Sequence, residues 1–155
     1  MKLQRVYIDT SVIGGCFDAE FAPGSNRVMQ DFEAGRLRAV VSDFVALEVN
    51  QGFDKIQAQF QQLLNWHPAW VTVTAEVVVL ADAYQLHRIL TPKSYDDGLH
   101  IASATIAEVD VLVSSNFKEI VNFHRMRLFN GVNLSFGYKA IQIFSPLEVV
   151  TDAGD

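Results

Sequence analysis

Three acids and one amide occupy positions in this sequence that suit metal chemistry. Asp9 ends the apolar run VYI, Glu48 lies in the apolar segment SDFVALEV, and Asp97 lies in SYDDGLHIASA. Asn116 follows the run VLVSS. Several carboxylates close together cannot all stay ionised unless a cation compensates them, and ligand sets made only of oxygen select Mg²⁺ or Mn²⁺. If folding gathers these side chains, the expected site therefore binds Mg²⁺ or Mn²⁺.

Asp9 and Asn116 each have a simpler explanation, because either could open the helix that follows it. A side-chain oxygen at such a position commonly accepts a backbone N–H and caps the helix. The position of Asp9 favours a further role, since the carboxyl end of a first strand is where α/β sites form. The amide oxygen of Asn116 could also serve a hard cation as a neutral ligand. Both interpretations stay open for each residue.

Asp97 stands three residues after Ser94, which matches a capping box at the start of a helix. Gly98 favours a functional role instead, because a glycine early in a helix costs about 1 kcal/mol relative to alanine. It is easier to understand where the backbone must pack or admit something closely. Asp96 competes for the same role. Neighbours in a helix point about 100° apart, so only one of the two acids should face a given pocket.

Glu48 lies in a helix that the sequence predicts to be largely buried, because apolar residues surround it. They are Phe44, Val45, Ala46, Leu47, Val49 and Phe53. An isolated buried carboxylate costs several kcal/mol or takes up a proton, so a glutamate there needs a partner. A solvated helix face is the alternative.

Short apolar strands alternate with helices along the chain. The strands are expected at residues 3–8, 38–41, 71–73, 109–114 and 140–144, and the helices at 25–34, 42–50, 53–65, 75–89, 94–107 and 117–134. This alternation indicates an α/β fold, a three-layer α/β/α sandwich with a central parallel sheet. Ligands of such sheets bind at the carboxyl ends of the strands. Asp9 and Asn116 fall at such ends, and the helices of Glu48 and Asp97 could lean over the same rim.

The composition suits one compact domain over residues 1–155, because half of the 155 residues are hydrophobic. The single cysteine, Cys16, cannot form an internal disulfide, and the four histidines show no zinc-binding spacing. No apolar run approaches the ~18 residues of a membrane span, and the N-terminal run is too short for a signal peptide. We therefore expect a soluble, cytoplasmic protein with no membrane association.

The net charge of −6 argues against a broad nucleic-acid-binding surface, since affinity for a phosphate backbone comes mainly from clustered Lys and Arg. Nucleic acid at a local site is not excluded, because acids gathered around metal ions make the working surface less negative than the net charge suggests. Such ions imply phosphate chemistry. They can lower the pKa of a bound water, align it with a phosphorus atom and stabilise the leaving oxygen, so no protein nucleophile is needed.

With these residues in view, the sequence resembles the PIN-domain ribonucleases, and particularly the VapC-type toxins of bacterial toxin–antitoxin pairs. The matching segments are YIDTSV, SDFVALE, DGLHIASA and DVLVSSNFKEI, which occur in the family's order from residue 6 to about residue 121. The tail, HRMRLFNGVNLSFGYKAIQIFSPLEVV, is also similar to the ending of a bacterial PIN-domain subgroup. The resemblance implies a PIN-like three-layer fold and an acidic pocket for Mg²⁺ or Mn²⁺. It also implies endonucleolytic cleavage of RNA through a metal-activated water, leaving 5′-phosphate and 3′-hydroxyl ends.

The resemblance assigns roles to the acids and the amide named above. Asp9, Glu48 and Asp97 match the three principal acids of the family. Asn116 falls where many members have a fourth acid, although the related subgroup often has asparagine there. The missing charge implies a weaker second metal site.

Hydroxyl residues and partners are implied in the same way. Ser114 matches a hydroxyl position beside the metal pocket that is commonly threonine. Thr10 and Ser11 sit where the family uses a hydroxyl to support the first aspartate or the substrate. The resemblance further implies a homodimer and a small antitoxin protein that silences the enzyme.

Other residues near these motifs have simpler interpretations. His100 lies on an apolar helix, which favours a hydrogen-bonded core histidine over a catalytic base. Cys16 is expected to be a small buried hydrophobe. Arg125, Arg127 and Lys118 follow the pocket and could touch RNA phosphates, although a solvated or acid-paired face is the commoner explanation.

Two other functions stay open. A PIN-like RNA- or protein-binding regulatory module with weak or no turnover would fit the asparagine at position 116 and the acidic surface. A receiver-like phosphoacceptor domain also gathers acids beside Mg²⁺. It would need a paired acid near the first strand and a lysine after a late strand, and neither is convincingly placed.

Overall fold

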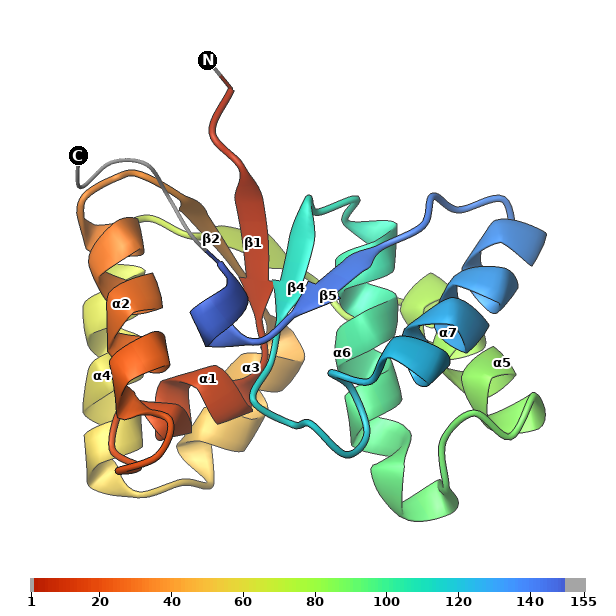
Figure 1. Ribbon diagram of the computed structural model, residues 1–155, viewed down its shortest axis with the longest axis horizontal. Helices are drawn as coiled ribbons and strands as arrows, with labels where there is room; N and C mark the ends of the chain where they lie inside the picture. The colour runs from red at the N-terminus through yellow and green to blue at the C-terminus, as the bar shows by residue number, and fades with distance from the viewer. Residues whose placement is uncertain (1, 150–155) are drawn as a thin grey trace.

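A five-stranded parallel sheet forms the centre of the computed structural model, which describes residues 2–149 (Figure 1). Its order is β3-β2-β1-β4-β5. The strands are β1 (Arg5–Ile8), β2 (Arg38–Ser42), β3 (Ala69–Val71), β4 (Val111–Val113) and β5 (Gln142–Phe144). The predicted domain of residues 1–155 also includes Met1 and residues 150–155, which lie outside the described part.

Helices cover both faces of this sheet. They are α1 (Thr10–Gly15), α2 (Ala22–Glu33), α3 (Asp43–Asn50), α4 (Asp54–Leu64), α5 (Ala75–Leu86), α6 (Tyr95–Ile106) and α7 (Phe123–Ser135). In Figure 1, α2 and α4 lie on one side of the sheet, and α5, α6 and α7 lie on the other. The predicted three-layer α/β/α sandwich is therefore confirmed. No helix within residues 2–149 is long and apolar enough to cross a membrane.

The central strand β1 marks the point where the order of the strands reverses. From β1 the chain adds β2 and β3 on one side, and it then crosses over to add β4 and β5 on the other. Ile8 pairs with Val113, so the next residues, Asp9 and Ser114, emerge together at the carboxyl ends of β1 and β4. Such a switch point is where open α/β sheets bind ligands.

The central strands are continuous apolar runs because helices bury both of their faces. Val6, Tyr7 and Ile8 of β1 have no exposed surface, and every residue of β4 is buried. Rigid, buried strands hold the residues that follow them in fixed positions. The switch point is therefore built on the most buried part of the fold.

Residues 117–121 do not belong to a helix, contrary to the expected helix over 117–134. α7 begins only at Phe123, because the Asn122 side chain accepts a backbone N–H at 3.1 Å and caps it there. In the preceding turn, two backbone N–H groups donate to the Asn116 carbonyl at 3.1 and 2.9 Å. The chain after β4 thus folds back toward the end of the sheet before α7 starts.

Other boundaries also differ from the expectation. The short helix α1, directly after Asp9, lies outside the expected helix ranges, and two of its six residues are glycines. β3 lies two residues earlier than the expected strand at 71–73, since Val73 donates its N–H to the Asp43 carboxylate at 3.2 Å instead of to a strand. α5 ends before the expected residue 89, where Arg88 adopts a left-handed φ of 57°.

α3 is less buried than its apolar sequence predicts. Val45 and Val49 are buried, but Leu47 is 54% exposed, and Phe53 beyond the helix is 83% exposed. Only one face of the helix packs against the core. Glu48 is half-buried at the edge of that face.

Candidate active site

Asp9 is a buried carboxylate at the carboxyl end of β1, with 3% of its surface exposed. It precedes α1 but makes no side-chain capping bond to it, so the capping explanation is wrong. Its two oxygens instead accept hydrogen bonds of 2.5 Å, Oδ1 from the Ser11 hydroxyl and Oδ2 from the Ser114 hydroxyl. Burial raises the pKa of Asp9, and the nearby charge of Glu48 adds to this, while His100 and both hydroxyls oppose it.

Asp97 lies in the first turn of α6, beside Asp9. Ser94 makes no side-chain capping bond, so the capping-box explanation is wrong here as well. Burial and then the negative charge of Asp9 raise the pKa of Asp97 to about 6, while His100 and the Asn116 side chain partly oppose this. The neighbouring Asp96 is exposed, so only Asp97 turns toward the site, as the helical spacing predicts.

Gly98 serves the packing of α6 rather than the entry of a ligand. A Cβ at this position would lie 3.3 Å from Leu90 Cδ1 and 3.6 Å from Tyr84 Cδ2. The first of these distances is tighter than ordinary van der Waals contact. Glycine therefore lets the start of α6 approach α5 closely, which sets the position of Asp97.

Glu48 of α3 has the partners that its half-buried position requires. The Thr10 hydroxyl donates to Glu48 Oε1 at 2.6 Å, and His100 Nε2 lies 2.6 Å from the same oxygen. Burial alone would raise the pKa of Glu48, but these interactions with His100 and Thr10 outweigh it and lower the pKa. His100 is 3% exposed and hydrogen-bonded at both ring nitrogens, which confirms the expected core histidine and places it against the site.

Asn116 follows β4 and joins the site through its amide. Its Oδ1 accepts the Glu119 backbone N–H at 3.0 Å, so the side chain stabilises the turn after β4. Its backbone N–H donates to the Ser114 hydroxyl at 3.0 Å. The side chain also donates toward Asp97 and lowers its pKa. This arrangement favours a donor role for Asn116 over that of an oxygen ligand.

Glu119 is a site acid that the sequence analysis missed. It is 8% exposed, forms an ion pair with Arg125, and its negative charge contributes to the raised pKa of Asp97. A helix over 117–134, as expected from the sequence, does not predict that the Glu119 side chain points inward. The observed turn buries this side chain. The spacing of an acid three residues after Asn116 was the one feature of the sequence that could have indicated it. The ion pair between Arg125 and Glu119 agrees with the expectation that Arg125 is paired with an acid instead of contacting RNA.

The remaining residues named from the sequence lie apart from these contacts. Lys118 and Arg127 are exposed, and Cys16 is buried as expected. The structure thus gathers Asp9, Glu48 and Asp97 at the switch point, and the three predicted hydroxyl residues hold two of these acids. The hydroxyl residues are Thr10, Ser11 and Ser114.

These donors fit a hydrated Mg²⁺ or Mn²⁺ better than a fully dehydrated ion. Within residues 2–149, no group of three or more His, Cys, Asp or Glu side chains is arranged to hold a metal ion. However, Asp9 and Asp97 are close enough for one charge to raise the pKa of the other, which a cation would relieve. Mg²⁺ commonly binds one or two carboxylates and keeps several waters. Asp9 and Asp97 suit this binding of a hydrated ion by two carboxylates.

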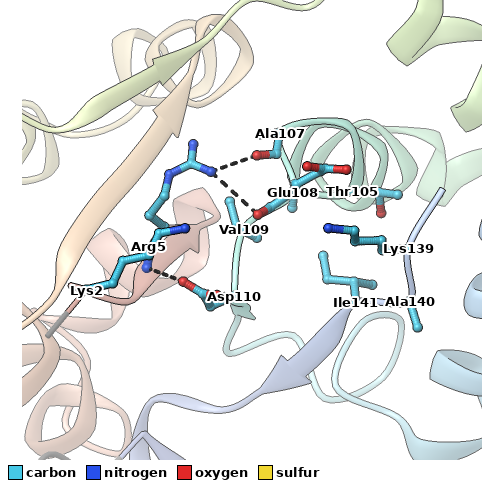
Figure 2. Close-up of a pocket in the computed structure, with 11 residues that line it drawn as sticks. Lys2, Arg5, Thr105, Ala107, Glu108, Val109, Asp110, Lys139, Ala140 and Ile141 are labelled. Atoms are coloured by element: carbon cyan, nitrogen blue, oxygen red, sulfur yellow. Dashed lines mark hydrogen bonds between the residues drawn. The ribbon is translucent and has the colours of Figure 1, made fainter.

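A polar cavity of about 390 Å³ lies at the opposite end of the sheet, near the start of β1 (Figure 2). The Arg5 guanidinium donates to the Ala107 carbonyl at 2.8 Å, at the C-terminal end of α6. The Arg5 backbone N–H donates to the Asp110 carboxylate at 2.7 Å. A cation at a helix C-terminus satisfies its free carbonyls, so Arg5 has a structural role there. This cavity contains none of the candidate site residues.

Chains in several solved structures share this fold. One is in VapBC2 from Rickettsia felis bound to a promoter DNA fragment, with a TM-score of 0.58, 13% identity, and coverage of 92% of this chain and 98% of that chain. Another is in a toxin–antitoxin complex from Klebsiella pneumoniae, with a TM-score of 0.60, 14% identity, and coverage of 93% and 99%. A third is in FitAcB from Neisseria gonorrhoeae, with a TM-score of 0.58, 12% identity, and coverage of 93% and 99%.

These likenesses confirm the PIN-like fold that the sequence resemblance implied. They extend over nearly the whole length of both chains in each comparison. No protein-family model matches the chain, and no curated protein matches its sequence.

Proposed function

We propose that this protein is a Mg²⁺- or Mn²⁺-dependent endoribonuclease of the PIN-domain type, acting as the toxin of a toxin–antitoxin pair. The observation that carries the proposal is the position of Asp9, which is buried at the carboxyl end of β1 and close enough to Asp97 for their charges to interact. Burial, and then the charge of Asp9, raise the pKa of Asp97 to about 6. A protein keeps two such carboxylates together at a cost that a bound cation would remove.

In this proposal, some residues bind the cation and others fix the positions of the binding oxygens. Asp9 and Asp97 hold the cation, and Glu48 adds negative charge directly or through water. Ser11 and Ser114 fix the two oxygens of Asp9, and Thr10 fixes one oxygen of Glu48. When bound, Mg²⁺ or Mn²⁺ supplies an activated water and stabilises the leaving oxygen of the RNA phosphodiester.

The proposed activity also requires contact with RNA phosphates. Arg125 is paired with Glu119, so the exposed Lys118 and Arg127 are the cations that we assign to this contact. Two such cations would suit a short stretch of RNA despite the net charge of −6.

Two partners belong to this proposal. One structure with this fold is a toxin–antitoxin complex from Klebsiella pneumoniae, which supports a small antitoxin as the partner here. A homodimer, implied by the sequence resemblance, and a cytoplasmic location, expected from the composition, complete the proposal. If a small protein encoded by the neighbouring gene copurifies with this protein, the proposal of an antitoxin partner is supported.

A second candidate is a PIN-like binding module with weak or no turnover. Hydroxyl donors already satisfy both oxygens of Asp9, and Asn116 donates to Asp97, so the pocket is hydrogen-bonded without a cation. Such a pocket could keep its shape after losing metal affinity.

RNA cleavage separates the two candidates. Purified protein is incubated with mixed RNA in Mg²⁺, Mn²⁺ or EDTA, and the fragment ends are mapped, with the Asp9→Asn variant in parallel. The nuclease proposal expects metal-dependent cleavage leaving 5′-phosphates, lost in EDTA and in Asp9→Asn. RNA that binds to wild type but stays intact in both metals would favour the binding module.

A further inference from the structure

A buried chain of hydrogen bonds runs behind Glu48. The Ser42 and Tyr7 hydroxyl oxygens lie 2.8 Å apart, and the Tyr7 hydroxyl lies 2.8 Å from His100 Nδ1. His100 Nε2 completes the chain at 2.6 Å from Glu48 Oε1. Ser42 and Tyr7 are 0% exposed and His100 is 3% exposed. This series of hydrogen bonds therefore crosses the core from the end of β2, through β1 and α6, to α3.

Each group in this series is held by a hydrogen bond to its neighbour. The lowered pKa of Glu48 makes its carboxylate an acceptor, so His100 Nε2 carries the proton between them. On the other side of the ring, Nδ1 is hydrogen-bonded to the Tyr7 hydroxyl, whose burial raises its pKa and keeps it protonated. The Ser42 hydroxyl contacts the Tyr7 hydroxyl, and its oxygen accepts the Val45 N–H at 3.2 Å.

Aromatic rings hold the imidazole in this orientation. The Phe44 ring lies 5.1 Å from the His100 ring, centroid to centroid, at an angle of 51°. The Tyr7 ring lies 5.8 Å away at 59°. Two hydrogen bonds and two ring contacts therefore fix the orientation of the His100 ring.

We propose that Tyr7 and His100 are positioning residues, which hold Glu48 by Oε1 so that Oε2 is left for the cation site. This inference rests on the proposed function. Thr10 donates to the same Oε1, and no described residue hydrogen-bonds Oε2. Removing a group that hydrogen-bonds a metal ligand typically changes metal affinity by about 10- to 100-fold. We expect an effect of about this size here.

Mn²⁺ affinity of the whole chain, measured by isothermal titration calorimetry without RNA, tests this role. We expect Tyr7→Phe and His100→Leu each to weaken Mn²⁺ binding by about 10- to 100-fold. Tyr84→Phe is the matched control, because it removes an equally buried phenol hydroxyl that donates to Asn133 at 2.5 Å, between α5 and α7. It should lower the melting temperature and leave Mn²⁺ affinity unchanged.

Two further measurements distinguish positioning from a general structural role. In a Glu48→Gln background, adding His100→Leu should cause no further loss of Mn²⁺ affinity, because His100 acts on the cation site only through the Glu48 carboxylate. Imidazole ¹⁵N NMR of the metal-free protein should show a proton on Nε2 in wild type and a changed Nδ1 shift in Tyr7→Phe, which lacks the hydroxyl partner of Nδ1. If His100→Leu does not fold, Tyr7→Phe and the NMR measurement decide the question.

The outcomes separate this inference from the proposed function. Wild-type Mn²⁺ binding that Tyr7→Phe and His100→Leu leave unchanged overturns the positioning role and leaves the nuclease proposal intact. Absence of Mn²⁺ binding in wild type, with Nε2 of His100 protonated, overturns the metal site and the inference that rests on it.

Discussion

Ser114 and Asp9, at the carboxyl ends of the neighbouring strands β4 and β1, are joined by a hydrogen bond of 2.5 Å. The Ser114 hydroxyl donates to Oδ2, and the Ser11 hydroxyl donates to Oδ1 from the other side. Both donors favour the ionised form of Asp9 against the burial that raises its pKa. The carboxylate is thus fixed in position and kept available for a cation.

Replacing Ser114 by alanine should impair cleavage more than it impairs folding. A hydrogen bond to a charged group is worth about 1.5–3 kcal/mol, which corresponds to a rate loss of about 10- to 100-fold in single-turnover RNA cleavage. Ser115→Ala is the control, because the Ser115 hydroxyl has no hydrogen-bond partner within the described residues. Equal losses in the two variants would contradict a specific role for Ser114.

Asp97 should make stability fall as the pH rises. Its pKa is about 6 in the folded protein and near 3.8 otherwise, so between these values the folded state binds more protons than the unfolded state. Its ionisation therefore costs stability, and this cost is complete above about pH 6. Asp97→Asn should be more stable than wild type at pH 8 by about 1–2 kcal/mol, with the difference vanishing below about pH 4.

Urea unfolding at a series of pH values measures this difference. Mg²⁺ should narrow the gap at pH 8, because a ligand that binds only the folded state stabilises it. A stability difference that stays constant from pH 4 to pH 8 would contradict the raised pKa of Asp97.

Arg125→Ala should destabilise the protein by about 1–3 kcal/mol, because it leaves the buried Glu119 carboxylate without its ion-pair partner. Arg125→Ala combined with Glu119→Gln should recover much of the loss, since no uncompensated charge then remains. Chemical unfolding of both single variants and the double variant gives the coupling energy. Strictly additive losses would show that the pair contributes nothing as a unit.

The sequence was sufficient for the overall fold because buried parallel strands are continuous apolar runs separated by amphipathic helices. Elements whose boundaries depend on tertiary contacts were harder to predict. α1 carries two glycines, and residues 117–121 form a turn around the Asn116 carbonyl instead of a helix. Local pattern could not distinguish that turn from the start of α7.

The candidate acids could be predicted because each stands at a strand end or in an apolar helix. Their partners could not, since side-chain contacts between distant segments have no local signature. His100 was expected to be a core histidine, but its bond to Glu48 joins residues 52 positions apart. Glu119 was missed because its inward direction depends on the turn after β4.

The central claim, that Asp9 and Asp97 form a metal-dependent nuclease site, is tested most directly by comparing Asp97→Asn with Asp96→Asn in RNA cleavage with Mg²⁺. The two substitutions remove the same charge from adjacent residues of α6, but only Asp97 is coupled to Asp9, and Asp96 is exposed. We predict a loss of about 100-fold or more in Asp97→Asn and wild-type cleavage in Asp96→Asn, with EDTA abolishing all activity. Cleavage that is equal in wild type and both variants would contradict the claim.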